Sequence, residues 1–381
     1  MGGPLQGLRI LELAGVGPGP FAAMMLADHG ADVIRVDRPG GVQAGLGGDP
    51  AKDVLARSRR TIAVDLKSPD GVEVVRALAA SADGLIEGFR PGVMERLGLG
   101  PEDLLKRNPK LVYGRMTGWG QSGPKAAVAG HDINYIALAG ALGAIGRAGE
   151  RPIAPLNLVG DFGGGGLLLA FAMVSAVWHA ARTGEGQVID CSMVEGAAVL
   201  TSMIWGLRAQ GVWRDERGVN ILDTGAHYYD TYETADGGHL AVGAIEPQFY
   251  AALRGKLGLA DDPAFDAQND PERWPELRAK LAQLFKTRTR VEWCALLEDV
   301  DVCVAPVLSF SEAPRHPHNA ARRSFVEAGG VMQPAPAPRY SKTATAAPAM
   351  SRGPVDSEEI LAELGYDAAK IAALRAAGAV A

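Results

Sequence analysis

Residues 8–37 read LRILELAGVGPGPFAAMMLADHGADVIRVD, and this stretch decides the fold. It begins with an aliphatic run, Leu8 to Leu13, which is typical of a buried strand. A helical pattern follows from Phe21, and a second strand-like run, Asp32 to Asp37, comes after it. A strand, a helix and a strand in this order predict two parallel strands joined by a helical crossover.

The same alternation continues over the first 120 residues. Further strand-like runs are Thr61–Leu66, Gly84–Glu87 and Leu111–Thr117, and a helix is expected from Gly71. A long apolar helical stretch, Gly166–Ala181, follows them. This rhythm predicts an α/β fold with a Rossmann-like parallel sheet.

The sequence pattern changes near Tyr228. Asp236-Gly237-Gly238 separates two strand-like runs, which is a hairpin signal, and three helical patterns follow. A proline-rich tract, Gln333–Pro354, indicates an extended linker, and one more helical pattern starts at Ser357. We therefore expect a large domain over residues 1–190, a helical linker over 191–227, a small domain over 228–315, a returning linker over 316–355, and a C-terminal helix over 356–381 that packs on the large domain.

The composition is that of a globular protein, and the length favours either two domains or one large α/β domain with a smaller one appended. The chain has 381 residues, of which 47% are hydrophobic and 22% charged. We expect no stretch of about 18 uncharged apolar residues and therefore no membrane span. A net charge of −6 argues against general binding to nucleic acid. The start lacks the layout of a secretory signal and the end is not a peroxisomal address, so the expected location is the cytoplasm. The cysteines have no metal-ligand spacing, so no metal site is expected: Cys191, Cys294 and Cys303.

The segment Gly15–Pro20 lies where a dinucleotide fingerprint would lie, between the first strand and the first helix. Pro20 stands where that fingerprint requires its third glycine. Proline rigidifies the segment and removes backbone N–H donors that a pyrophosphate would need. A structural turn is therefore favoured over an NAD site.

Several cations are expected at the carboxyl edge of the sheet. Arg38 ends the second strand, although a solvated arginine explains it equally well. The basic run Arg57–Arg60 enters the next strand, and with Lys67 and Arg90 it is expected to line the same edge. Convergent cations indicate a phosphorylated ligand.

His131 and Asp161 are two titratable groups of different type, thirty residues apart. The backbone is expected to turn sharply at both residues: His131 opens a helical pattern, and Asp161 leads into four glycines that could let a ligand approach closely. Such a pair can serve two opposite proton transfers, and free N–H groups beside His131 can stabilise an oxyanion. A structural histidine and a helix-capping aspartate are the alternatives.

The chain resembles the α-methylacyl-CoA racemases, a branch of the family III CoA-transferase superfamily. The likeness covers nearly the whole chain, and five segments carry it. Three are shared across the superfamily, Leu11–Phe21, Val36–Gly40 and Gly88–Gly98, and two look specific to the racemases, Ala129–Tyr135 and Val159–Gly165.

This resemblance implies a Rossmann-like large domain, a small α+β domain and a homodimer whose subunits interlock like two rings. The active site would then be shared between subunits, with His131 and Asp161 from one chain and Glu246 from its partner orienting His131. Asn157 would support Asp161, and the backbone N–H of Asp132 would receive an enolate oxygen. The residues implied in binding the CoA thioester are Arg38, Ala63, Val64, Asp65, Leu66, Gly88, Arg90, Gly130, Ile133, Asn134 and Tyr135.

The expected activity is the interconversion of (2R)- and (2S)-2-methylacyl-CoA by 1,1-proton transfer through an enolate. Proton transfer needs no metal or redox cofactor, and CoA enters as part of the substrate. Asp161 must be held protonated in one state, which requires a raised pKa. One alternative is a CoA-transferase in which Asp161 is the nucleophile, against which His131 argues; another is a catalytically silent CoA-binding module.

Overall fold

The computed structural model describes residues 2–41 and 49–381. The loop Gly41–Ala51, to which the sequence assigns no function, is thus described only at its ends. The chain divides into two compact units. Unit 1 contains the described residues up to Ala139 together with Leu156–Leu200 and Ala320–Ala381, and unit 2 contains Gly140–Pro155 and Thr201–Asn319.

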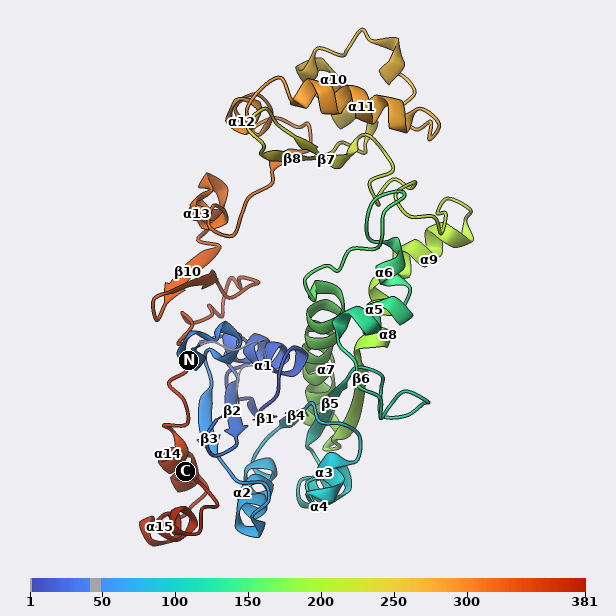
Figure 1. The fold of residues 1–381 in the computed structure, drawn as a ribbon. Coiled ribbons are helices and arrows are strands. Elements are labelled where there is room, and N and C mark those ends of the chain that lie inside the picture. Colours follow the sequence, from blue (N-terminus) through green and yellow to red (C-terminus); the bar gives the residue numbers. More distant parts are fainter. Residues whose placement is uncertain (1, 42–48) are drawn as a thin grey trace. The chain divides into compact units, whose positions relative to one another are not determined.

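A six-stranded sheet forms the centre of unit 1 (Figure 1). Its order is β3-β2-β1-β4-β5-β6, and every neighbouring pair is parallel. This is the strand order of the dinucleotide-binding folds, which confirms the predicted α/β class. The sixth strand has no counterpart in the expected set, because its exposed outer residues break the apolar run. The strands are β1 Arg9–Leu13, β2 Asp32–Asp37, β3 Arg60–Ala63, β4 Gly84–Glu87, β5 Val112–Thr117 and β6 Gln187–Ser192.

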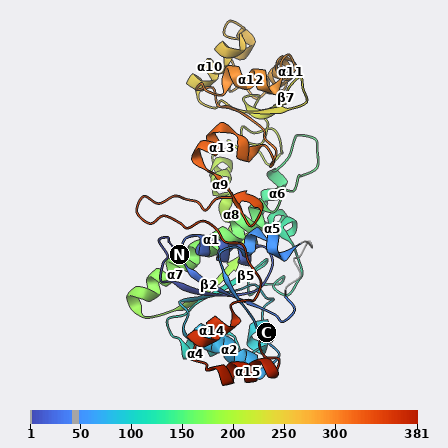
Figure 2. The same ribbon diagram turned by 90° about the vertical axis from the view of Figure 1, so that its left-hand side faces the viewer.

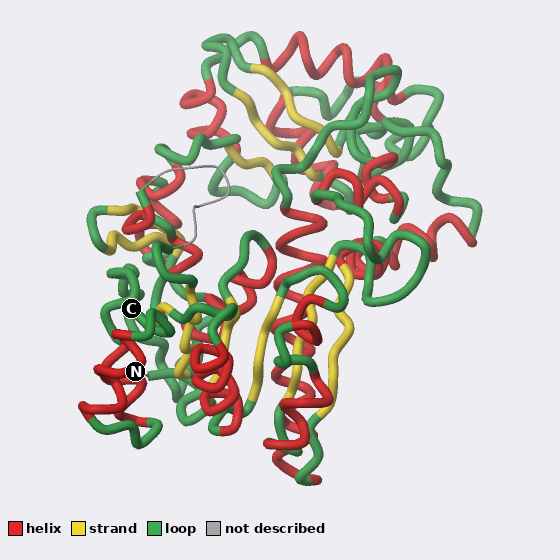
Figure 3. Tube along the Cα trace, turned by 60° about the horizontal axis from the view of Figure 1, so that its bottom comes forward, coloured by secondary structure: helices red, strands yellow, loops and turns green. Residues whose placement is uncertain are grey.

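Helices cover both faces of this sheet, whose strands run side by side in Figure 3. On one face α1 (Pro18–Asp28) and α7 (Leu168–Thr183) enclose a core that includes Ile10 and Met173. On the other face lie α2, α4, α14 and α15, which Figure 2 shows close together. The helices of this face and of its loops are α2 Pro69–Ala80, α3 Val93–Arg96, α4 Pro101–Arg107, α14 Ser357–Glu363 and α15 Ala368–Ala376. Short 3-10 turns lie at Pro50–Lys52 and Val54–Ala56.

Helix α1 begins at Pro18 rather than at the expected Phe21. Proline is suited to the first position of a helix, where its missing N–H would have no partner and its fixed φ is already helical. Gly17 precedes it with a φ of 72°, so the turn is confined to the residues before Pro18. The segment is a structural turn as expected, but a shorter one.

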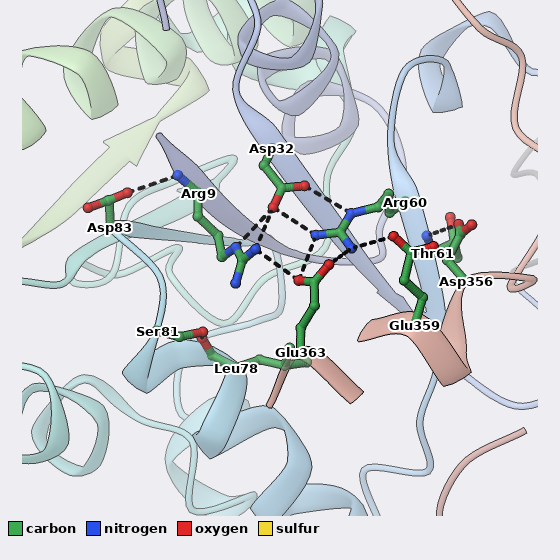
Figure 4. A network of polar contacts seen from close by, with 10 residues as sticks. All are labelled: Arg9, Asp32, Arg60, Thr61, Leu78, Ser81, Asp83, Asp356, Glu359 and Glu363. Carbon is green, nitrogen blue, oxygen red and sulfur yellow. Dashed lines mark hydrogen bonds and ion pairs between the residues drawn. The ribbon is translucent and has the colours of Figure 1, made fainter. Parts of the chain in front are cut away.

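The C-terminal segment packs on unit 1 through charges and backbone bonds. Glu363 of α14 pairs with Arg9 and Arg60, which both also pair with Asp32 (Figure 4). Val380 forms an antiparallel bridge with Val64 just beyond β3. These contacts join the first strands of the sheet to the last residues of the chain.

Unit 2 is built on a three-stranded antiparallel sheet in the order β7-β8-β9. The expected large domain, residues 1–190, includes Gly140–Pro155, which belongs to unit 2 here. Arg147 explains this placement, because its guanidinium pairs with the buried carboxylate of Asp230 on β7 at 2.7 Å. The elements are β7 Tyr229–Glu233, β8 His239–Gly243, β9 Val304–Pro306, α6 Ala141–Ala144, α9 Ser202–Ala209, α10 Pro247–Leu257, α11 Trp274–Phe285 and α12 Arg290–Leu297, with 3-10 turns at Pro263–Phe265 and Ala313–Arg315.

The segment expected as a returning linker, residues 316–355, has local structure of its own. It contains α13 (Pro317–Arg322) and a two-stranded hairpin of β10 (Phe325–Ala328) and β11 (Val331–Pro334). Gly329 and Gly330 at the turn both have positive φ, which explains why the chain reverses there. The proline-rich tract that follows β11 contains no further helix or strand before α14.

A continuous helical run, Leu158–Thr183, is long and apolar enough to cross a membrane by length and composition. It has 26 residues and a mean hydropathy of 1.6, so the expectation that no such stretch exists is wrong. Four glycines extend the uncharged window beyond its leucine-rich part. Core helices of globular proteins also pass this test, and Leu169 and Met173 of this run are fully buried against the sheet. The absence of a membrane-spanning segment stays a prediction.

Candidate active site

Asp161 lies in the first turn of a π-helix, Leu158–Leu167, which continues directly into α7. Asn157 precedes this helix with a φ of 60°, a left-handed conformation that asparagine tolerates. Its side-chain Nδ2 donates a hydrogen bond to Oδ2 of Asp161 at 2.9 Å. Burial raises the pKa of Asp161, the Asn157 amide acts against that rise, and the nearby Asp132 carboxylate adds to it. Asn157 and Asp161, for which the resemblance implied a supporting contact, are thus directly hydrogen-bonded.

The four glycines after Asp161 form part of this helix, and the expected sharp turn is absent. They allow other helices to cross at short range. A Cβ on Gly164 would lie 2.6 Å from the backbone nitrogen of Ala197 in α8 (Met193–Leu200), and a Cβ on Gly166 would lie 2.7 Å from the carbonyl oxygen of Pro18. Close helix packing, rather than ligand approach, explains the glycine run.

His131 is the N-cap of α5, which spans Asp132–Leu138. This residue is exposed and has an extended backbone, and its backbone N–H donates a hydrogen bond to Oδ1 of Asn134 at 3.1 Å. The positive charge of a protonated His131 lowers the pKa of Asp161, against the larger rise that burial causes. Unit 1 thus brings together the two titratable groups that the sequence selected.

Asp132 occupies the first position of α5, where its backbone N–H has no acceptor within the helix. The residue is only 2% exposed. Oδ1 of this buried carboxylate accepts a hydrogen bond from the backbone N–H of Asp161 at 2.7 Å. The sequence suggested only a backbone role for Asp132, because a contact between residues 29 positions apart leaves no local pattern.

The residues expected to bind the CoA thioester follow the strands of unit 1. Arg38 comes directly after β2, and its exposed side chain donates from Nε to the carbonyl oxygen of Gly41 at 2.8 Å. Ala63 ends β3, and the backbone of Ala63–Asp65 is bonded to the C-terminal residues Ala379–Ala381. Since parallel strands share their carboxyl ends, these backbone segments lie along one edge of the sheet.

Gly88 and Arg90 are exposed in the loop after β4. The fully buried Glu87 anchors this loop, because its Oε2 accepts the N–H of Phe89 at 2.7 Å and its Oε1 pairs with Arg115 at 3.0 Å. Burial raises the pKa of Glu87. Nothing in the sequence singled out Glu87 or Arg115 as support for this loop.

The other expected ligand-binding residues lie in or beside α5. Gly130 is partly buried, whereas Ile133 and Asn134 are exposed on the first turn of the helix. Tyr135 differs, since it is 6% exposed and its ring meets that of Trp119 edge-on at 4.7 Å. The Tyr135 ring is therefore fixed by core packing.

A family model described as CoA-transferase family III matches residues 5–355. This chain belongs to CoA-transferase family III. The family III chain is 50% identical over 371 residues to alpha-methylacyl-CoA racemase of Mus musculus, covering 96% of the chain and 95% of the mouse protein. It is 48% identical to alpha-methylacyl-CoA racemase of Homo sapiens over the same shares. A solved CAIB/BAIF family protein from Brucella suis superposes with a TM-score of 0.81 at 27% identity, covering 96% of this chain and 100% of that one.

The basic run of this family III protein does not line the carboxyl edge of the sheet, so that expectation is wrong. Arg57 and Arg59 are buried and pair with Asp28 and Glu12. Arg60 is the first residue of β3, at the opposite edge, where it pairs with acidic groups as described above. Arg57 pairs with the last residue of α1, and Arg59 pairs with a residue inside β1.

Gly17 is a contact of the family III site that the sequence did not reveal. A Cβ on Gly17 would lie 3.3 Å from Oδ2 of Asp161, so the turn before α1 touches the carboxylate.

Glu246 lies in unit 2, where it is exposed and caps the start of α10 with an extended backbone. Among the described residues, no group of three or more His, Cys, Asp or Glu side chains could hold a metal ion.

Proposed function

We propose that this chain is an α-methylacyl-CoA racemase, an isomerase that interconverts (2R)- and (2S)-2-methylacyl-CoA thioesters. The observation that carries the proposal is the pairing of His131 and Asp161 within unit 1, each on its own helix start. Relatives called alpha-methylacyl-CoA racemase match nearly the full chain, which supports the same activity.

The reaction is two proton transfers on opposite faces of one carbon. In one direction neutral His131 removes the proton alpha to the thioester carbonyl, and the C–H electron pair moves into an enolate. Protonated Asp161 then delivers its proton to the other face of that carbon. In the reverse direction Asp161 is the base and protonated His131 is the acid, so the pair carries one proton in either resting state.

The environment of Asp161 suits this role. Burial raises its pKa, which keeps a larger protonated fraction near neutral pH than an exposed aspartate has. The N–H of Asp132, at the start of α5, is the donor for the enolate oxygen. Arg38, Arg90 and the edge residues Ala63–Leu66 hold the CoA moiety, and the segment Gly130–Tyr135 holds the thioester end.

The active form is an interlocked homodimer in which Glu246 of the partner subunit orients His131. An exposed apolar stripe supports self-association: Leu167, Phe171, Val174 and Trp178 recur at helical spacing, and Phe171 and Trp178 are 70% and 65% exposed. A lone subunit leaves this stripe in water, whereas a second copy covers it.

The rival activity is CoA transfer, in which the Asp161 carboxylate attacks the thioester carbonyl and displaces CoA. That step needs an ionised carboxylate, and the burial that raises the pKa of Asp161 opposes it. It also gives His131 no role. Racemisation uses both groups and is therefore the better account.

The deciding experiment incubates the purified protein with one enantiomer of a 2-methylacyl-CoA in deuterium oxide, without a second acid. Racemisation gives deuterium at the alpha carbon together with loss of optical purity, measured by NMR and chiral chromatography. Absence of exchange, with CoA transfer appearing once a free carboxylic acid is added, would sink the two-base mechanism in favour of the transferase.

A further inference from the structure

The carboxylate of Asp132 has an environment that its sequence neighbours do not explain. It is 2% exposed, and a buried carboxylate is costly unless hydrogen bonds replace its lost hydration. Its Oδ1 meets the backbone N–H of Asp161 at 2.7 Å. The side chain next to His131 thus bonds to the backbone of the other titratable group.

This contact is accommodated by the residue before Asp161. A Cβ on Gly160 would lie 2.4 Å from Oδ1 of Asp132 and 3.0 Å from Cγ2 of Ile136. Glycine therefore leaves the space that the carboxylate and α5 occupy. The donor, the N–H of Asp161, and the space at Gly160 both belong to the π-helix, while the accepting carboxylate belongs to α5. The contact therefore fixes how closely α5 approaches the π-helix.

Asp161 is consequently held at two points. Asp132 holds its amide, and Asn157 holds its carboxylate at 2.9 Å. Because Asp132 adjoins His131 in the chain, the first of these bonds sets the spacing between the two titratable groups. Proton transfer to and from one carbon is sensitive to that spacing, since shifts below 1 Å change reaction rates strongly.

We propose that the Asp132 side chain is a positioning residue for racemisation, which holds the Asp161 backbone in register with His131 and places a second carboxyl group beside the pair. The inference rests on the proposed racemase activity and concerns a side chain that never touches the substrate. The titratable groups that face Asp161 are His131, which caps α5, and Asp132 and Tyr135 within that helix. Of these, Asp132 both accepts the backbone N–H of Asp161 and raises the pKa of its carboxyl.

Two substitutions separate these contributions. Asp132→Asn keeps a side-chain oxygen that accepts the Asp161 N–H but removes the charge, whereas Asp132→Ala removes both. In the deuterium assay, Asp132→Ala lowers kcat by about 10-fold or more in both directions while KM changes less than about 2-fold. Asp132→Asn restores most of kcat, and the acid limb of its pH profile moves to lower pH because the pKa of Asp161 falls without the neighbouring charge.

The matched control is Asp367→Ala at the N-cap of α15, where a carboxylate likewise accepts a backbone N–H, that of Lys370, at 2.8 Å. This variant keeps wild-type kcat. Gly160→Ala, which crowds the Asp132 carboxylate, lowers kcat as Asp132→Ala does. Thermal melts of each variant accompany the assays. Loss of melting temperature with unchanged kcat in Asp132→Ala would overturn the inference, and so would equal kcat losses in the Asn and Ala variants with no displacement of the pH profile.

The wild-type protein distinguishes the two levels of proposal. Absence of alpha exchange in the wild type removes the racemase proposal and this inference with it. Exchange in the wild type together with full kcat in Asp132→Ala removes only the positioning role.

Discussion

Asp161 combines a group that must release a proton with surroundings that help it keep one. Burial favours its neutral form, and the Asn157 amide favours its charged form. The two influences oppose each other at a single carboxyl. A group tuned in this way can act as acid and base in alternate turnovers, which is what racemisation asks of it.

Removing the Asn157 donor tests this balance. Asn157→Gly keeps the positive φ of 60° without strain and deletes the hydrogen bond to the carboxylate. The pKa of Asp161 then rises further, so the acid limb of the kcat/KM profile moves to higher pH. We expect kcat/KM at the acid end to fall by about 10-fold, the value of one hydrogen bond to a charged group. An unmoved acid limb in deuterium-exchange kinetics would show that Asp161 does not titrate in the reaction.

His227 is a buried histidine that the proposed chemistry does not use. It is fully buried in unit 2, and its Nε2 lies 2.7 Å from the hydroxyl of Tyr250. Burial, aided by Arg278, lowers the pKa of His227 to about 4. The unfolded chain, with a histidine pKa of about 6.5, therefore binds more protons than the folded one between these values.

Stability of unit 2 consequently falls as pH drops from about 6.5 to about 4, by up to about 3 kcal/mol in total. Hydrogen exchange of the β7 and β8 amides, corrected for intrinsic rates, measures this loss. His227→Gln flattens the dependence, whereas His239→Gln, at an exposed position on β8, leaves it as in the wild type. Equal pH dependence in all three proteins would contradict the assignment.

At the residue scale, the sequence was sufficient to identify candidate site residues that stand in a recognisable local segment. His131, Asp161 and Asn157 stand in recognisable segments, and the structure brings all three into unit 1. Gly17 and the Asp132 side chain could not be found this way, because each acts by meeting a residue far along the chain. The misplacement of Arg57 and Arg59 has the same origin: their acidic partners lie on other elements.

Among the elements, the π-helix and α8 cross at very short range. A Cβ on Gly196 would lie 1.8 Å from the carbonyl oxygen of Gly164, and backbone cannot yield as a flexible side chain can. Because Asp161 lies one turn before this crossing, the packing that orders α8 also fixes the helix that carries the carboxyl.

Gly196→Ala therefore destabilises the protein by about 3 kcal/mol or more, at the upper end of overpacking effects. The control is Gly206→Ala on α9, where an added Cβ meets no atom within 4 Å and alanine favours the helix by about 1 kcal/mol. Urea unfolding of both variants measures the contrast. Similar stabilities would mean that α8 can move away from the π-helix at little cost.

Sequence periodicity predicted whether a segment is a helix or a strand better than it predicted where the element begins and ends. The parallel strands were predicted because buried strands of such sheets are continuous apolar runs. The start of α1 was misjudged by three residues, since Pro18 and Pro20 look like breakers although proline is favourable in a first helical turn. The glycine run was misread as a turn, because only the packing of α8 and α1 shows why a helix tolerates it.

For the whole molecule, the units are discontinuous in sequence. Residues 140–155 leave unit 1 and return to it before the π-helix, held in unit 2 by Arg147. No composition change marks these boundaries, so a linear division of the chain could not find them. His131 and Asp161 consequently flank an excursion into unit 2, while Glu246 lies within unit 2 itself.

The proposed sharing of the site between subunits is tested with hybrid dimers. His131→Ala and Glu246→Gln chains carrying different affinity tags are co-expressed, and the mixed dimer is isolated through both tags. In a shared site, the His131 of one chain meets the Glu246 of the other, so one of the two sites in each hybrid is intact. The hybrid should then show about half the wild-type activity per dimer, while each parent homodimer shows little. If Glu246 instead serves the His131 of its own chain, every site in the hybrid lacks one group and deuterium exchange stays at the level of the parents.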